Sequence, residues 1–474
     1  YNSGTGSWVE AGTGALSAGG VSHTSGAATR PRLASGGSKL YLTWVNEQIE
    51  DGETRHFYLY AKEWNGTKFV EEITGDASGY GISQTGGEPD AITLSVDQTG
   101  HSFVAWGDSS SKSSEIYVRG NTFDVNRVFV ANETTSIQSI IHSNNLTEGD
   151  VIYVEAGTYS DSITISAADS GFIIVGSPDL GSEISGSITI DGTSNIVLQR
   201  LKLSGNVNIT GNATNITLKE NNIENATVTL SSTTSARVFH NTFIEGAALY
   251  IENSTDLVIS YNTFNTSDLG ISINTSSEGT ISHNDIEASN TGIRLSAAFS
   301  GIILNNKIHD CTTGIVYDAP AALSGNRIFG NDTGISTTLF DETEALGYVG
   351  SAEPNDIYQN TIGINLHDAR VKSQHVFLNT TGIFGSGIIG SDTLEDANLI
   401  EENYTGIGQF SGTVQYNRIS GNTIGIQAMD DQTIYHNIIY RNVQMGLAIS
   451  GVSDVRVITV SYTHLRAHET RHDL

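Results

Sequence analysis

The chain has 474 residues, which is enough for two or three domains, and its single cysteine excludes a scaffold stapled by disulfides. With 52 acidic against 23 basic side chains the formal charge is −29, so duplex nucleic acid and anionic membrane surfaces are unfavourable partners. No apolar run in the sequence reaches the length of a membrane span.

The first residue is Tyr1 rather than Met, and no signal peptide is visible. Acidity with modest hydrophobicity suits a soluble secreted protein in salty water. We therefore expect a monomeric segment of a longer extracellular or cell-surface protein.

Residues 1–128 are predicted to form a partial β-propeller-like domain. Two stretches of alternating strands can be aligned, the first ending in Trp44 and the second in Trp106. They resemble propeller blades, and Ser95–Gly100 is loosely similar to the Asp-containing hairpin of sialidase-type blades. The spacing departs from that motif, so no sialidase residue is assigned. Two blades cannot close a ring, which needs at least about four, so either upstream blades are missing or this is a different β domain.

A short helix is predicted where the second domain, residues 129–459, begins. Thr134–Ser136 provides the cap for a short amphipathic helix that starts at Ile137. Gly149 and Asp150 then lead into the alternating strand Val151–Val154. Followed by Gly157-Thr158-Tyr159, this order resembles the entry to pectin-lyase-like β-helices, and the resemblance implies that the helix covers the open end of the coil, which would otherwise pair with other chains.

One pattern is repeated nine times between Asn262 and Leu447. It reads Asn, any residue, an aliphatic or aromatic residue, and then Gly-Ile (Gly-Leu, one residue late, in the last copy) eight positions after the Asn. Copies start 19 to 29 residues apart, a period typical of a solenoid. Gln374 takes the first position once, and the other copies begin at Asn262, Asn284, Asn306, Asn326, Asn355, Asn398, Asn417 and Asn437.

The repeat predicts stacked strands and turns, because its short runs alternate and show no helical period. Stacked turns would bury a continuous core, with each strand parallel to its copy at roughly 4.8 Å. Asparagine tolerates the left-handed backbone of a sharp turn and can hydrogen-bond its copies above and below. These asparagines are therefore predicted to form a structural ladder and are assigned no chemistry.

The pattern resembles the right-handed parallel β-helix repeat of the pectin-lyase-like superfamily, over about Ile137–Thr459. The resulting fold class is all-β: a right-handed parallel β-helix of about fourteen coils with an N-terminal helix cap, preceded by the propeller-like domain. The resemblance implies polysaccharide lyases, hydrolases and epimerases, but also adhesins and structural stalks.

Residues 460–474 break the repeat. The stretch Val460–Thr470 resembles a translated transposase-end sequencing adapter, so we predict an artefactual tail and do not count its histidines as a metal site.

Two positions of the repeat carry candidate functional residues. Cys311 stands five residues after Asn306 and is interpreted as a packing substitution for an asparagine, since no catalytic partner motif is in view. Later coils carry asparagine at this second position: Asn331, Asn360, Asn379, Asn403, Asn422 and Asn442. The residue before the first Asn is aromatic or imidazole in five coils, and such a column could stack sugars, although half-exposed strand-end residues are the favoured explanation. These five are His240, Tyr261, His283, Tyr416 and His436.

The densest cluster of chemistry is His367, Asp368 and Arg370, which combines a general-base candidate, a carboxylate and a guanidinium. Lyases of the superfamily abstract a proton beside a uronate carboxylate and need a base and a neutralising cation. Coil spacing places the other acidic candidates too far away for a dyad but near enough to line one groove. The insertion that starts at Phe340 could wall this groove. The candidate glycan groove comprises Asp318, His367, Asp368, Arg370, Asp430 and Asp431.

Two hypotheses from different classes follow. The favoured one is a non-catalytic extracellular or cell-surface β-helix module of a larger bacterial protein, with a glycan-binding or adhesive role. The alternative is a polysaccharide lyase, epimerase or hydrolase acting in the groove; a third is an enzyme whose catalytic part lies upstream. The expected partner is a polysaccharide or cell-surface glycan. No metal site or cofactor is predicted, and calcium stays open without a motif to support it.

Overall fold

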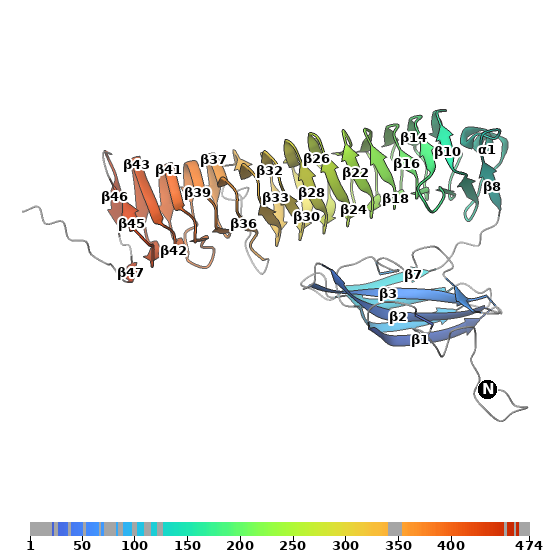
Figure 1. Cartoon of the computed structure of the whole chain (residues 1–474), viewed down its shortest axis with the longest axis horizontal. Coiled ribbons are helices and arrows are strands. Elements are labelled where there is room, and N and C mark those ends of the chain that lie inside the picture. Colours follow the sequence, from blue (N-terminus) through green and yellow to red (C-terminus); the bar gives the residue numbers. More distant parts are fainter. Residues whose placement is uncertain are drawn as a thin grey trace, which may run out of the picture. The chain divides into compact units, whose positions relative to one another are not determined.

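The computed structural model divides the chain into two compact units, Tyr1–Phe123 and Asp124–Leu474, which are described separately (Figure 1). The residues that the structure describes are 21–22, 27–36, 39–50, 54–65, 68–70, 82–83, 89–96, 102–108, 115–120, 127–339, 353–449, 453–458 and 461–463.

The first unit contains two antiparallel sheets in its described part. One has the order β1 (Ala28–Gly36), β2 (Lys39–Glu50), β3 (Thr54–Trp64), β4 (Phe69–Val70), and the other the order β5 (Asp90–Val96), β6 (Ser102–Asp108), β7 (Glu115–Gly120). Val45 and Leu59 of the first sheet pack against Val104 and Trp106 of the second. Two packed meanders do not by themselves confirm a propeller, which stays a prediction; residues 97–100 of the sialidase-like hairpin lie outside the described residues.

The second unit is a parallel β-helix built from three long sheets (Figure 1). Sheet 1 contains, in stacking order, β10 (Gly157–Tyr159), β13 (Ser182–Ile184), β16 (Lys202–Leu203), β19 (Asn222–Glu224), β22 (Thr242–Glu245), β25 (Thr263–Thr266), β28 (Asp285–Ala288), β31 (Lys307–His309), β34 (Arg327–Phe329), β36 (Asp356–Tyr358), β38 (His375–Phe377), β40 (Leu399–Glu401), β42 (Arg418–Ser420), β44 (Ile438–Tyr440) and β47 (Ser461–Thr463).

Sheet 2 contains β11 (Ile163–Ile165), β14 (Ile188–Asp191), β17 (Val207–Thr210), β20 (Thr227–Ser231), β23 (Ala248–Glu252), β26 (Leu269–Ile273), β29 (Thr291–Leu295), β32 (Thr313–Tyr317), β35 (Thr333–Thr337), β37 (Ile362–Val371), β39 (Thr381–Ile389), β41 (Thr405–Gln415), β43 (Ile424–Tyr435) and β45 (Met445–Ala448), with β46 (Arg456–Ile458) also paired to β43. Sheet 3 contains β8 (Val128–Ala131), β9 (Val151–Val154), β12 (Ile173–Val175), β15 (Val197–Gln199), β18 (Thr217–Lys219), β21 (Arg237–Phe239), β24 (Leu257–Ser260), β27 (Gly279–Ser282), β30 (Phe299–Leu304) and β33 (Ala321–Ser324).

The register follows the sequence repeat. In sheet 1, Ile286, Ile308 and Ile328 are direct partners in successive coils, and all three are fully buried. Burial of each such side chain contributes roughly 1.5–3 kcal/mol to the free energy of folding. Together these side chains form a core that runs through the inside of the coil. The prediction of a parallel β-helix is confirmed, with fifteen strands in sheet 1 where about fourteen coils were expected.

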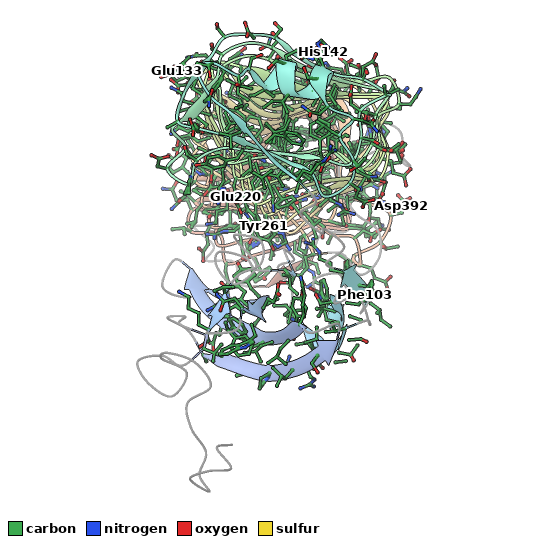
Figure 2. The ribbon with its side chains drawn as sticks, turned by 90° about the vertical axis from the view of Figure 1, so that its right-hand side faces the viewer. Phe103, Glu133, His142, Glu220, Tyr261 and Asp392 are labelled. Carbon is green, nitrogen blue, oxygen red and sulfur yellow. The ribbon has the colours of Figure 1, made fainter. Side chains whose placement is uncertain are left out.

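Helix α1 (Ile137–Ser143) lies at the start of the β-helix, as predicted for a cap. The hydroxyl of Ser136 accepts a hydrogen bond from the backbone N–H of Ser139, and Ile137, Ile140 and Ile141 are buried. Figure 2, which views the β-helix along its length, shows α1 with His142 across this end of the coil. The helix thus covers the first turn of the core.

Side-chain amides form a continuous ladder inside the turn between sheets 3 and 1. Nδ2 of Asn262 donates to Oδ1 of Asn284 at 2.9 Å, and the same contact recurs from Asn284 to Asn306. Gln374 continues the ladder, since its Oε1 accepts from Asn355 and its backbone N–H donates to Asn398. The residue before each of these amides often has positive φ, as His283 does at 54°.

The predicted tail is described only at its start. Ser461–Thr463 forms β47, which pairs in parallel with β44, and residues 464–474 lie outside the described residues.

Candidate functional site

The cluster predicted at His367 lies within a strand rather than in a turn, because β37 continues to Val371. A register shift between Leu366 and Ala369 breaks the alternation. His367 and Asp368 are therefore both exposed, and Ala369 returns to the core.

Three carboxylates of the predicted groove are hydrogen-bonded to a hydroxyl of a neighbouring coil. The oxygen pairs are Asp318 with Thr338 (3.0 Å), Asp368 with Ser386 (2.6 Å) and Asp430 with Ser453 (3.1 Å). Asp431 is exposed in a left-handed conformation at φ 58°. These contacts run between adjacent coils, so they stabilise the stacking of the coils at the predicted groove, which we call the corner. They do not bring the carboxylates together into one centre.

Arg370 is buried, in contrast to His367. Its Nε donates to the carbonyl oxygen of Gly390 at 3.2 Å, and its Nη2 lies 3.7 Å from Oδ1 of Asp392. Figure 2 shows Asp392 on a different side of the β-helix from Glu220 and Tyr261. Residues 340–352, which include most of the predicted groove wall, lie outside the described residues.

The predicted aromatic column stacks on itself. The ring centroids of His240 and Tyr261 are 5.3 Å apart, and those of Tyr261 and His283 are 4.9 Å apart with planes 14° from parallel. Tyr416 and His436 repeat the arrangement at 4.9 Å. Because the rings cover each other's faces, the column presents ring edges rather than ring faces to the solvent. Burial also lowers the pKa of His240 to about 3, so this imidazole is neutral.

A second aromatic column lies on the outer face of sheet 1, and the sequence analysis did not single it out. Its rings stack at centroid distances of 5.0, 5.1 and 5.0 Å, with planes within 19° of parallel. All four side chains are half-buried. We call the column the outer strip; it consists of His309, Phe329, Tyr358 and Phe377.

The outer strip exposes ring edges, because the ring faces stack along the direction from coil to coil. Ring edges carry the positive end of the aromatic quadrupole, so they attract electronegative oxygens. Arg327 adds a cation at the centre: its Nη2 donates to the hydroxyl of Tyr358 at 2.8 Å, and its guanidinium carbon lies 5.8 Å from the rings of Phe329 and Tyr358.

His375 lies beside the strip between two carboxylates. Its Nδ1 is 2.8 Å from Asp356 and its Nε2 is 3.1 Å from Glu401, while its ring stacks on Phe377 at 4.2 Å. Burial lowers the pKa of His375, but the hydrogen bonds that its ring donates to Asp356 and Glu401 together outweigh that effect, and the net pKa is raised.

His309, at the other end of the strip, is held in the same way. Its Nε2 is 2.7 Å from Asp285 and its Nδ1 is 2.8 Å from Asp310. The hydrogen bond that His309 donates to Asp285 is the largest influence, and the pKa of His309 is raised to about 9. His309 is therefore an imidazolium at neutral pH, which donates hydrogen bonds and does not act as a base.

The strip could have been found by reading one position further in the repeat. Its members stand three residues after the ladder amide of each coil, so that His309 follows Asn306 and Phe329 follows Asn326. In sheet 1 this position is paired in register from coil to coil. The position is occupied by four residues of three different types, and a search for identical residues passes over it.

Metal-binding potential is weak in the described part of the chain. Over residues 127–339 and 353–449 and the shorter described segments, no group of three or more His, Cys, Asp or Glu side chains is placed to hold an ion. The thiol of Cys311 is buried and donates to the carbonyl oxygen of His309 at 3.2 Å, and burial raises its pKa to about 11. Among the described helices, none is long and apolar enough to cross a membrane.

Comparison with known proteins adds a family match. A family described as periplasmic copper-binding protein (NosD) matches residues 185–395. A comparison with curated proteins found no match.

Several solved structures are similar to the chain. The periplasmic alginate epimerase AlgG is 13% identical over 74% of this chain and 86% of that chain, with a TM-score of 0.22. The A-module of Azotobacter vinelandii mannuronan C-5 epimerase AlgE6 is 13% identical over 71% and 97%, with a TM-score of 0.30. A hyperthermoactive exopolygalacturonase from Thermotoga maritima is 8% identical over 65% and 84%, with a TM-score of 0.23. Likeness at this level carries no inference about a site or a substrate. The second unit of the chain is a parallel β-helix, and residues 185–395 are similar to the family of the periplasmic copper-binding protein NosD.

Proposed function

We propose that the β-helix is a non-catalytic glycan-binding module of the bacterial cell envelope, and that it binds glycan along the outer strip of sheet 1. The supporting observation is the continuous row of half-buried rings from His309 to Phe377, flanked by charged hydrogen-bonding groups. The match to a periplasmic family favours the envelope as its location.

The chemistry of the strip suits sugar hydroxyls. The guanidinium of Arg327 donates hydrogen bonds, and Asp356 and Glu401 accept them. The ring edges add apolar area that also attracts oxygen atoms. A sugar has both kinds of surface, so it would satisfy the strip better than a purely apolar or a purely ionic ligand.

Charge favours a neutral glycan. The whole chain carries −29, which repels a polyanion at long range. Both cations and carboxylates surround the strip, and a neutral ligand is repelled by neither. The cations are Lys307, His309 and Arg327, and the carboxylates are Asp285, Glu287, Asp310, Asp356 and Glu401, with His375 bonded between the last two.

The test is affinity electrophoresis of the purified chain in gels that contain neutral or acidic polysaccharides. We expect retardation by a neutral polysaccharide and a loss of affinity of about tenfold, or ~1.4 kcal/mol, in Tyr358→Ala. Tyr250→Ala is the matched control, because Tyr250 is also half-buried but lies on β23 of sheet 2. No retardation of folded protein by any polysaccharide, or equal retardation of Tyr358→Ala, would overturn the proposal.

A second candidate function, a polysaccharide lyase, epimerase or hydrolase, has one observation in its favour. The guanidinium of Arg327 is bonded to the phenol of Tyr358, which puts a cation next to a proton-transfer group on an exposed face. The corner with Asp318, His367, Asp368, Arg370, Asp430 and Asp431 stays a proposed groove for the same activity. Unsaturated products or new reducing ends that disappear in Tyr358→Phe would place catalysis on the strip, and their disappearance in Arg370→Ala would place it at the corner.

Copper, which the description of the matching family names, does not fit the described residues. Copper sites use thiolate, thioether and imidazole ligands grouped around the ion. The single thiol, Cys311, is buried with a pKa of about 11, and His309 and His375 are each engaged by two carboxylates. We therefore assign the β-helix no step that involves copper.

A further inference from the structure

We infer that the ligand of the outer strip is an extended, neutral polysaccharide chain that lies parallel to the axis of the β-helix with one sugar on each coil. This inference rests on the proposed glycan-binding function and adds the orientation, the shape and the length of the bound chain. The affinity of the strip would then depend on the length of the bound chain, which would not be so for a pocket that holds a single sugar.

The first support is the spacing. Neighbouring rings of the strip are 5.0–5.1 Å apart, because successive coils of a parallel β-helix stack at roughly 4.8 Å. In an extended polysaccharide with equatorial 1,4-linkages, each sugar advances the chain by about the length of its own ring, which is close to this step. Successive sugars would therefore meet successive coils in the same way.

The second support is the repetition of polar groups at the same step. Arg327 lies beside Phe329, the ring of its own coil. Asp356 is the register partner of Arg327 in the next coil, and His375 is the register partner of Asp356 in the coil after that. A chain along the axis would meet a donor or an acceptor at every sugar. A chain lying across the coils would meet the three-residue width of one strand and then leave the sheet.

The third support is the limited length of the strip. Glu287 occupies the register position one coil before His309, and Glu401 the position one coil after Phe377. The rings thus span four coils and are bounded by a carboxylate at each end. The geometry predicts a footprint of four sugars.

Chain shape then selects the class of ligand. A β-1,4-linked neutral chain stays straight over four sugars, whereas an α-1,4-linked glucan curves away from a straight surface. Sheet 1 stacks in register through β31, β34, β36 and β38, so the rings form one row that runs from coil to coil. The class is therefore the neutral, extended polysaccharide.

The experiment is titration calorimetry of the whole chain with β-1,4-linked gluco-oligosaccharides from the disaccharide to the hexasaccharide, and with the α-1,4-linked hexasaccharide. We expect affinity to rise by a factor of several with each sugar up to the tetrasaccharide and then to level off. The α-linked hexasaccharide should bind at least about tenfold more weakly than the β-linked one.

Variants at the ends of the strip test the register. Phe377→Ala removes the last ring and should move the plateau from the tetrasaccharide to the trisaccharide, whereas Tyr250→Ala on sheet 2 should leave it in place. Phe377→Leu serves if the alanine variant fails to fold, which circular dichroism will show. Binding of the wild type that is independent of length, or equal for both linkages, overturns the inference and leaves glycan binding standing. No binding of any glycan by folded protein overturns both.

Discussion

Nδ2 of Asn284 donates a hydrogen bond to Oδ1 of Asn306, 2.9 Å away in the next coil, and the backbone N–H of Asn284 donates to the same oxygen at 2.9 Å. Asn306 in turn donates to the carbonyl oxygen of Ile281. It also donates to Oδ1 of Asn326, so one side chain satisfies two buried donors and two buried acceptors.

Asn306→Ala should therefore destabilise the β-helix strongly. Each buried group left without a partner costs about 1–3 kcal/mol, so we expect a loss of ~3 kcal/mol or more. The measurement is the thermal unfolding midpoint of the purified chain. The control is Asn290→Ala, which removes an exposed amide that bonds Asp268, and an equal shift in both variants would contradict the assignment.

Gly334→Ala tests the close approach of neighbouring turns. A Cβ at this position would lie 2.6 Å from the carbonyl oxygen of Gly363 and 3.0 Å from Nδ2 of Asn360. The backbone at Gly334 cannot move away without disturbing its packing against the next coil. We expect a loss of roughly 2 kcal/mol. Gly246→Ala should be less costly, because its Cβ would lie 3.1 Å from Oδ1 of the exposed side chain of Asn225 and no closer than 3.7 Å to any backbone atom. A chain that tolerates both changes equally in thermal melts would exclude backbone crowding at Gly334.

His309→Phe tests the ionic contribution of the outer strip while keeping the ring stack. The folded pKa of about 9 lies above the unfolded value of about 6.5, so the imidazolium contributes stability that is complete below about pH 6.5 and is lost as the pH rises through about 9. Because Asp285 is half-exposed, we expect only ~1–2 kcal/mol. Denaturant titrations should show a larger deficit in His309→Phe at about pH 6 than at about pH 10. A deficit independent of pH would mean that the imidazolium contributes nothing.

His240 should have the opposite dependence on pH. Its folded pKa of about 3, lowered by burial, means that the unfolded chain takes up a proton below about pH 6.5 while the folded chain does not, so stability falls as the pH falls from about 6.5 towards 3. In His240→Phe, which keeps the contact with Tyr261, this loss should be absent. The variant should exceed the wild type by ~2 kcal/mol at about pH 4, relative to their difference at neutral pH. Parallel pH profiles of the two proteins would rule out a buried neutral imidazole.

The sequence predicted those parts of the structure that depend on identical residues at a fixed period. Equivalents of Asn262, Ile286 and Gly334 occur in successive coils, because each coil needs a ladder amide, a core side chain and a close approach of its backbone to the next coil. The capping helix was also predictable, since Ser136 and the buried isoleucines of α1 are local signals.

The functional surfaces were harder to predict for two physical reasons. The outer strip uses His309, Phe329 and Tyr358 interchangeably, since stacking requires a flat ring rather than one residue type. At the corner, exposure depends on a bulge after Leu366 that the alternating pattern does not encode, and it leaves Arg370 buried.

The amide ladder also bears on how such a protein can change in size. Each rung contacts only its neighbouring coils, so excision of one period, residues 284–305, would bring the amide of Asn262 to the oxygen of Asn306 and restore the same bond. Insertion of a period would do likewise. Duplication or deletion of the coding sequence for one coil can therefore lengthen or shorten the β-helix while its fold stays the same. The distance between the two ends of the β-helix changes with the number of coils.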